Sequence, residues 1–232
     1  MTKEVEQAFK AAIPIFIGYV PAAVAFGILS KGCGITLLQC FLFSAVVFAG
    51  ASQFIALNLL MTGMGGGGVI LTTLLVNFRH FLMSASLSTR VSQMSRRAHV
   101  LMAFGVTDEV FSVLSFRKGT LTKRFVFLLE LSAYSAWVSG TVAGYILGGF
   151  LPDILTKSMG VALYALLLAI LVPELKNSIK AVVLAIASGL LNSVLIKLDI
   201  LPDGWTIIVC ILVVALAGTF FMVDDVREEV YG

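Results

Sequence analysis

The sequence is divided into eight long apolar runs by short hydrophilic breaks. Of its 232 residues, 59% are hydrophobic and 12% are charged, whereas an ordinary soluble domain carries roughly 25% charged residues. Runs of this length suit membrane-spanning helices rather than barrel strands, which are about ten residues of alternating character. The eight runs are Ala11–Ser30, Leu37–Leu60, Val69–Ser88, Val100–Phe116, Phe125–Phe150, Met159–Val172, Ala181–Ile196 and Thr206–Val223.

Two of these runs are interrupted at their centres. Leu37–Leu60 contains Ala49-Gly50-Ala51-Ser52, and Val100–Phe116 is short and polar in its middle. If all eight runs cross, nine lysines and arginines lie on the side of the termini and six on the other side. If the two interrupted runs re-enter from opposite faces, Arg90, Arg96 and Arg97 change sides and the count becomes twelve against three. Cytoplasmic loops are enriched in lysine and arginine, which favours the second arrangement.

The sequence therefore predicts an all-α polytopic membrane bundle with six to eight membrane segments. Residues 1–232 form a single transmembrane domain, two segments are broken or re-entrant, and both termini are cytoplasmic. Eight ordinary helices remain the alternative, and they leave the termini on the same side. We expect no cleaved signal peptide, because residues 1–10 are polar and the following run is long.

Small residues mark two places where helices are expected to pack closely. Without a hydrophobic effect between helices in lipid, small residues let backbones approach. One seam has a small residue at every fourth position: Ser132, Ala136, Gly140, Gly144 and Gly148. The other comprises Ala181, Ala185, Gly189 and Ser193.

The first apolar run contains two prolines. Pro14, Gly18 and Pro21 share a helix face, and Pro21 removes the hydrogen bond to the Ile17 carbonyl. We expect a kink or a partly unwound turn here, with backbone exposed to a cavity. Gly50 is expected to break the second run in the same way.

A guanidinium and an imidazole lie near the middle of the third apolar run. Arginine at the centre of a membrane helix costs about 2.5–3.5 kcal/mol on insertion scales, so Arg79 must face protein or water. Arg79 and Asn77 could hold a substrate carboxylate, and His80 could carry a proton. The structural alternative is that Arg79 caps carbonyls or pairs with an acidic residue to fasten two helices.

Two acidic residues interrupt the fourth apolar run. Asp108 and Glu109 follow Thr107, and either is a natural partner for Arg79 and a candidate for taking up and releasing a proton. The alternative is a solvated turn at the membrane surface. Glu130, six residues after Arg124, is expected to lie at the interface beside Lys123 and Arg124.

The centre of the second run offers a third candidate. Ser44, Gly50, Ser52 and Gln53 are small or polar residues in mid-membrane. Free N–H groups at the end of a half-helix attract anions, although a tight helix crossing would use similar residues.

Enzymatic and metal chemistry find little support in the sequence. Ala136-Trp137-Val138-Ser139-Gly140 superficially resembles the serine motif of rhomboid proteases, but both histidines, His80 and His99, precede Ser139, whereas those proteases carry theirs later. Three scattered cysteines and two histidines offer no recognisable metal-ligand spacing. We therefore predict no catalytic site, no metal and no cofactor.

Four motifs in order resemble the azaleucine-resistance (AzlC-like) family. They are Pro14/Gly18/Pro21 running into Ala25-Phe26-Gly27, Ser44 with Phe48-Ala49-Gly50-Ala51-Ser52-Gln53-Phe54, Asn77-Phe78-Arg79-His80, and Thr107-Asp108-Glu109. The resemblance is specific over residues 13–112, and the C-terminal half resembles the family mainly in hydropathy.

The resemblance implies a function that composition does not reveal. Family members are large subunits of secondary exporters in the bacterial cytoplasmic membrane. They export leucine, isoleucine, valine and sometimes methionine, with a small AzlD-like membrane partner and the proton gradient. On these positions we place substrate contacts at Arg79, Asn77, Gly50, Ser52, Gln53 and Phe26, and proton coupling at Asp108, Glu109 or His80. The competing classes are a channel and a non-transporting membrane scaffold.

Overall fold

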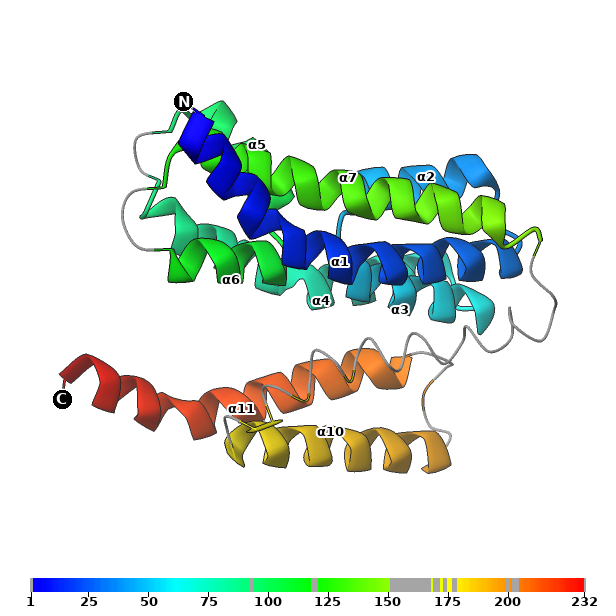
Figure 1. Cartoon of the computed structure of the whole chain (residues 1–232). Coiled ribbons are helices and arrows are strands. Elements are labelled where there is room, and N and C mark those ends of the chain that lie inside the picture. Colours follow the sequence, from blue (N-terminus) through cyan, green and yellow to red (C-terminus); the bar gives the residue numbers. More distant parts are fainter. Residues whose placement is uncertain are drawn as a thin grey trace. The chain divides into compact units, whose positions relative to one another are not determined.

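Every described element of the chain is a helix, which confirms the predicted all-α fold (Figure 1). The computed structural model describes residues 2–91, 94–117, 121–150, 179–198 and 205–231, with residue 201 and a few isolated positions between 168 and 176. The chain divides into two compact units. The first comprises Met1–Leu57 and Val76–Leu163, and the second Asn58–Leu75 and Tyr164–Gly232.

Four of the described helices are long and apolar enough to cross a membrane. They are α1 (Thr2–Gly32), α4 (Gly66–Ser88), α7 (Lys123–Leu147) and α10 (Ile179–Leu198). A fifth long helix, α11 (Trp205–Tyr231), is apolar over Trp205–Thr219. The predicted run Met159–Val172 lies almost wholly outside the described residues.

The frame of the first unit is a parallel pair made by α1 and α7. Glu4 accepts a hydrogen bond from the Thr122 hydroxyl at one end of the pair. Nearer the other end, a Cβ on Gly140 would lie 2.8 Å from the Ala23 Cβ, and one on Gly148 would lie 3.3 Å from the Ile28 Cα. A Cβ on Gly144 would collide with the Val24 backbone. The glycines of the predicted seam, Gly140, Gly144 and Gly148, are therefore confirmed as contacts with α1.

The second predicted seam is not a close helix contact within the described residues. α10 packs against α11, but no atom lies within 4 Å of the position a Cβ would take on Gly189. The glycine that approaches the neighbouring helix is instead Gly218 of α11, which faces the Leu184 side chain at 3.3 Å. Spacing alone did not identify the face that packs.

The run Leu37–Leu60 is broken, as predicted, into α2 (Leu37–Val46) and α3 (Gly50–Met61). α2 descends along α7, where the Ser44 and Thr141 hydroxyls are 2.8 Å apart and Tyr134 donates to the Ala45 carbonyl. The chain turns back at the break. The rings of Phe43 before the break and Phe54 after it both contact Phe26, so the two residues lie at the same level. The segment is therefore a helical hairpin (Figure 1).

The run Val100–Phe116 is also broken, into α5 (Arg96–Gly105) and α6 (Asp108–Phe116), which are bent by 118° to each other. Both ends of this segment lie together. Arg90, just before α5, donates to the carbonyls of Leu114, Ser115 and Arg117 at the end of α6, at 2.6–2.8 Å. The segment therefore enters and leaves on one side.

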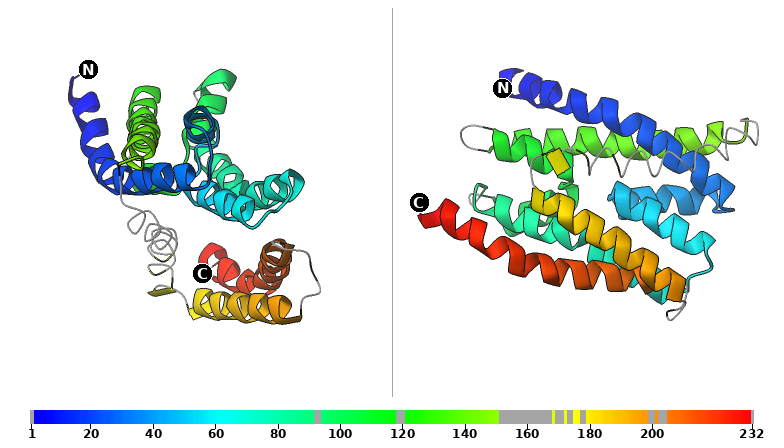
Figure 2. Two further views of the ribbon diagram at one scale, coloured as in Figure 1. Left: turned by 90° about the vertical axis from the view of Figure 1, so that its right-hand side faces the viewer. Right: turned by 90° about the horizontal axis from the view of Figure 1, so that it is seen from below.

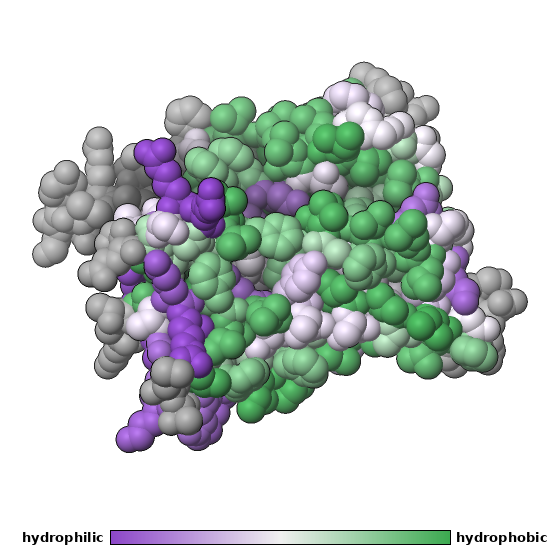
Figure 3. Space-filling view, turned by 90° about the horizontal axis from the view of Figure 1, so that it is seen from above, coloured by the Kyte–Doolittle hydropathy of each residue, from purple (hydrophilic) through white to green (hydrophobic). Residues whose placement is uncertain are grey.

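These contacts place three basic segments at one end of the first unit, here called the basic end. Arg117 donates to Gln7 Oε1 at 2.9 Å, so the start of α1 lies beside the link between α6 and α7. Hydrophilic side chains gather at this end in Figure 3. The described lysines and arginines at the basic end are Lys3, Lys10, Arg90, Arg96, Arg97, Arg117, Lys123 and Arg124. The positive-inside rule assigns it to the cytoplasm.

The two hairpins enter the first unit from opposite ends. The α2–α3 hairpin begins where α1 finishes, with Tyr145 near the end of α7 donating to the Ile35 carbonyl, whereas the α5–α6 hairpin begins and ends at the basic end (Figure 1). α7 runs parallel to α1. The two broken segments therefore have opposite orientations within the first unit.

α1 continues as one helix through both of its prolines. It bends in its first half (Figure 2), since a proline removes a hydrogen bond and crowds the preceding turn. Of the two expected outcomes, the kink is therefore present and an unwound turn is not. Pro14, Gly18 and Pro21 lie on an exposed face of this helix, where nothing lies within 4 Å of a Cβ on Gly18.

We expect Gly144→Ala to destabilise the protein and Gly18→Ala to leave it unchanged or slightly more stable. Overpacking against the Val24 backbone should cost about 1–3 kcal/mol, whereas alanine in an open helix position gains roughly 0.5–1 kcal/mol over glycine. Thermal unfolding of the detergent-purified variants measures the difference. Equal melting temperatures for the two variants would contradict the close α1–α7 contact.

Candidate functional site

The break between α5 and α6 places two carboxyls inside the first unit. Thr107 is buried and caps α6 by accepting the Val110 N–H at 3.4 Å. Asp108 and Glu109 occupy the first turn of α6, where acidic residues are stabilised by the helix dipole. The chain folds this way because a hydroxyl followed by two acidic residues is a favourable helix start.

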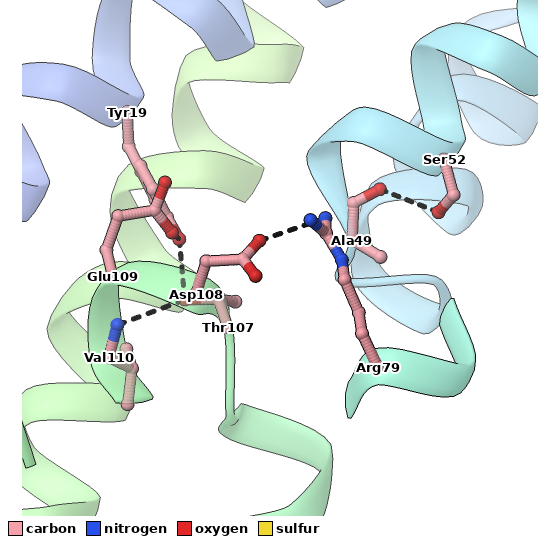
Figure 4. A network of polar contacts seen from close by, with 8 residues as sticks. All are labelled: Tyr19, Ala49, Ser52, Arg79, Thr107, Asp108, Glu109 and Val110. Carbon is pink, nitrogen blue, oxygen red and sulfur yellow. Dashed lines mark hydrogen bonds and ion pairs between the residues drawn. The ribbon is translucent and has the colours of Figure 1, made fainter. Parts of the chain in front are cut away.

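Asp108 forms an ion pair with Arg79 of α4. Arg79 Nη2 lies 2.9 Å from Asp108 Oδ2, and both side chains are about one-third exposed, at 34% and 35%. Figure 4 shows the Arg79 side chain extending from α4 to meet Asp108 at the tip of α6. The expectation that an acidic residue of this motif partners Arg79 is confirmed, with Asp108 rather than Glu109 as the partner.

Glu109 is held by a residue that the sequence reasoning missed. The Tyr19 hydroxyl lies 2.5 Å from Glu109 Oε2 and 2.7 Å from Thr107 Oγ1, so α1 is tied to the start of α6. Tyr19 is buried and its ring packs edge-on against Phe48 and Trp137. The one signal in the sequence that could have identified Tyr19 is a tyrosine within an otherwise apolar run. A buried tyrosine hydroxyl usually has a hydrogen-bond partner.

Two buried polar atoms of α4 have no hydrogen-bond partner within the described residues. Asn77 Oδ1 and Arg79 Nε are both buried and unpaired. The first can only accept a hydrogen bond and the second can only donate one. Leaving such groups unsatisfied costs free energy. Arg79 Nε can donate to an anionic group of a ligand at the ion pair, whereas Asn77, two residues earlier on α4, faces another side of the helix.

The residues predicted around the first break mostly secure the hairpin. Gln53 is fully buried: its Nε2 donates to the Phe43 carbonyl at 2.7 Å, and its Oε1 accepts from Trp137 Nε1 at 2.7 Å. Ser52 donates to the Ala49 carbonyl at 2.9 Å. A Cβ on Gly50 would lie 2.6 Å from the Trp137 ring. These contacts fix the α2–α3 hairpin to α7 and leave the break itself beside Trp137.

Two further predicted residues lie apart from the ion pair. Phe26 is fully buried in a cluster of rings formed with Phe43, Phe54 and Trp137. In this state of the protein it acts as a packing residue. His80 is half-buried on α4.

The expectation that Glu130 lies at the membrane interface beside Lys123 and Arg124 is wrong. Glu130 is 5% exposed and its Oε1 has no partner within the described residues. The error arose from linear distance along α7: about two helical turns separate Glu130 from Arg124, and its face of the helix turns inward.

The site thus combines one guanidinium, that of Arg79, with the carboxyls of the adjacent residues Asp108 and Glu109. Arg79 neutralises Asp108, and Tyr19 donates to Glu109, so a proton or a ligand ammonium could still neutralise one carboxyl. No group of histidine, cysteine, aspartate or glutamate suited to a metal ion occurs among the residues that the structure describes. The arrangement is suited to binding a small molecule that carries both charges.

We expect Arg79 and Asp108 to be energetically coupled. Arg79→Gln and Asp108→Asn should each lower the melting temperature, while the double variant loses less than the sum, with a coupling of roughly 0.5–3 kcal/mol. Glu6 and Lys10, 2.7 Å apart but largely exposed, provide the matched control pair and should show little coupling. Additive losses at Arg79 and Asp108 would contradict the ion pair.

Comparison with known proteins places the chain in a family. The family model described as AzlC protein matches residues 14–151. A membrane protein of Archaeoglobus fulgidus is 35% identical over 190 residues, which cover 78% of this chain and 83% of that protein. Inner membrane protein YgaZ of Escherichia coli is 35% identical over 147 residues, 61% of this chain and 60% of YgaZ.

A third relative carries a functional name. The branched-chain amino acid transport protein AzlC of Bacillus subtilis is 29% identical over 151 residues, which cover 62% of this chain and 58% of that protein. The chain thus spans about three-fifths of the length of the E. coli and B. subtilis relatives. No solved structure matches. Since the family model covers more than half of the sequence, the chain belongs to the AzlC family of membrane transport proteins.

Proposed function

We propose that this chain is the substrate-translocating subunit of a secondary exporter of branched-chain and other hydrophobic amino acids. Leucine, isoleucine, valine and methionine are the substrates we expect. Export is driven by the proton gradient and requires a small AzlD-like membrane partner. The name of the B. subtilis relative supports the substrate class, and the site supports the chemistry.

The observation that carries this proposal is the Arg79–Asp108 ion pair inside a membrane domain. An α-amino acid has a carboxylate and an ammonium on neighbouring atoms, so it can insert between the two side chains. Its carboxylate then binds Arg79, where the free Nε adds a second donor. Its ammonium binds Asp108, the partner that Arg79 has in the absence of substrate. Both substrate charges are thereby matched without leaving a protein charge unpaired in lipid.

The same geometry limits selectivity among substrates. One methylene group in an apolar pocket is worth only about 1–3 kcal/mol of binding free energy. The charged ends therefore define the class of substrate, and amino acids that differ only in their apolar side chains are weakly distinguished. The apolar side chain would lie toward the aromatic residues around Tyr19 and Phe48, whose rings are in contact. Phe26 would contact substrate only after this cluster opens.

Proton coupling is assigned to the carboxyls of the α6 start or to His80. When the substrate ammonium binds Asp108, Glu109 remains bound to Tyr19. After the substrate leaves, a proton on Asp108 or Glu109 could balance the second negative charge beside one guanidinium. His80, half-buried on the helix that carries Arg79, could pass the proton on.

We expect the chain, expressed with its partner, to lower the intracellular leucine pool of cells that lack their own exporters and are fed a leucine-containing dipeptide. Arg79→Gln should abolish this effect while the protein still inserts, because the carboxylate loses its charged partner. Arg79→Lys should recover only part of it, since lysine cannot bind in bidentate fashion. Arg96→Gln, which changes an exposed arginine of the basic end, is the matched control and should export normally.

Three outcomes would contradict the proposal. An unchanged leucine pool with both proteins in the membrane removes the branched-chain assignment. Normal export by Arg79→Gln indicates a scaffold that supports its partner. Flux that neither saturates with substrate nor depends on the proton gradient indicates a channel.

A further inference from the structure

Glu130 is an acidic side chain that the ion-pair site does not use. It lies on α7, it is 5% exposed, and its Oε1 has no hydrogen-bond partner within the described residues. An ionised carboxylate buried without a partner carries a large desolvation cost. Acidic residues placed inside a membrane domain at this cost are functional candidates by default.

The Glu130 carboxyl lies against the end of α5. A Cβ on Gly105, the last residue of α5, would lie 2.6 Å from Glu130 Cδ and 2.7 Å from Oε2. A side chain at position 105 would therefore displace the Glu130 carboxyl from its present place. The last carbonyls of a helix have no partner within it and carry partial negative charge. They oppose a carboxylate and can accept a hydrogen bond from a protonated carboxyl.

The ionisable groups on the helices that pack against α7 do not pair with Glu130. Glu130 takes part in neither of the ion pairs found among the described residues, and its Oε1 is buried without a partner. The helices that pack against α7 are α1, α2, α5 and α6. Their ionisable groups are Lys3, Glu4, Glu6, Lys10, Tyr19 and Lys31 on α1, Cys40 on α2, Arg96, Arg97 and His99 on α5, and Asp108 and Glu109 on α6; Lys123, Arg124, Tyr134 and Tyr145 are on α7 itself. None of these is hydrogen-bonded to Glu130.

We propose that Glu130 is a proton-binding site whose protonation holds the α5–α6 hairpin against α7. The neutral carboxyl lies beside Gly105 while the hairpin is docked. When the hairpin moves away, water reaches the carboxyl and it releases its proton to water as hydronium. Re-docking requires the reverse transfer, from hydronium to the carboxylate, so each docking cycle takes up and releases one proton.

The chain connects this proton to the substrate site directly. Gly105 ends α5, Val106 and Thr107 form the break, and Asp108 begins α6. A displacement of Gly105 therefore moves Asp108 relative to Arg79. This inference rests on the proposed transport function for its physiological meaning, whereas the proton site itself can be observed without transport.

Infrared spectroscopy of the purified protein in lipid nanodiscs tests the proton site. We expect the C=O band of a protonated carboxyl to persist at neutral pH, to shift in heavy water, and to disappear in Glu130→Gln. Glu6→Gln removes a largely exposed glutamate and should retain the band. A spectrum that Glu130→Gln leaves unchanged would overturn the proposal.

Transport assays test the coupling separately. Glu130→Gln mimics the neutral carboxyl and should still exchange labelled leucine for unlabelled leucine across vesicle membranes, while an imposed pH gradient no longer drives net flux. Glu130→Asp keeps a carboxyl and should recover part of the gradient-driven flux. Normal gradient-driven flux in Glu130→Gln would overturn the coupling role. If the wild-type protein with its partner exchanges no leucine, the proposed export function fails, and the infrared result still decides the proton site.

Discussion

The structure depends on finding partners for two costly features of an apolar domain: a charged side chain within a membrane helix and the free backbone groups at a helix break. Arg79 lies in the middle of a membrane helix, and Asp108 lies at a helix start that exists because the chain breaks after Gly105. An unpaired arginine at this depth would be costly, and so would a broken helix whose end found no partner. The ion pair addresses both needs, because Asp108 neutralises Arg79 and also sits at the positive end of α6.

The α1–α7 pair provides a rigid frame for this pairing. Gly27, Gly140 and Gly144 bring the two backbones so close that added methyl groups would clash. The α2–α3 hairpin is fastened to α7 by two hydrogen bonds, one from Trp137 to Gln53 and one between the hydroxyls of Ser44 and Thr141. The α5–α6 hairpin meets α7 through the rings of Phe104 and Tyr134 and through Gly105 beside the unpaired Glu130 carboxyl. Its break is bound by Tyr19 of α1 and Arg79 of α4.

Much of this arrangement follows from the sequence. Apolar length predicts the spanning helices, small residues every fourth position predict the α7 face, and polar residues in mid-run predict both breaks. The partner of Arg79 could also be predicted, because an internal guanidinium requires an anion and few acidic residues are available. These are local patterns or strong energetic requirements, and both can be seen in a linear sequence.

The remaining features depend on three-dimensional packing. Tyr19 binds Glu109 across 90 positions of sequence, and no local pattern announces such a contact. Glu130 was expected at the membrane interface because the basic residues Lys123 and Arg124 precede it on α7. Its side chain instead lies against Gly105. Gln53 has the composition of a ligand contact, but its donors and acceptors are taken by Phe43 and Trp137. Which polar residues are satisfied and which are left unpaired is a property of the fold.

The central claim is that one ion pair recognises both charges of an amino acid. Equilibrium binding to the purified chain with its partner tests it most directly, by comparing leucine with leucinamide, which lacks the carboxylate, and 4-methylpentanoate, which lacks the ammonium. Each charged hydrogen bond is worth about 1.5–3 kcal/mol, so each analogue should bind about tenfold to a hundredfold more weakly than leucine. Equal binding of leucine and either analogue would contradict recognition by Arg79 and Asp108.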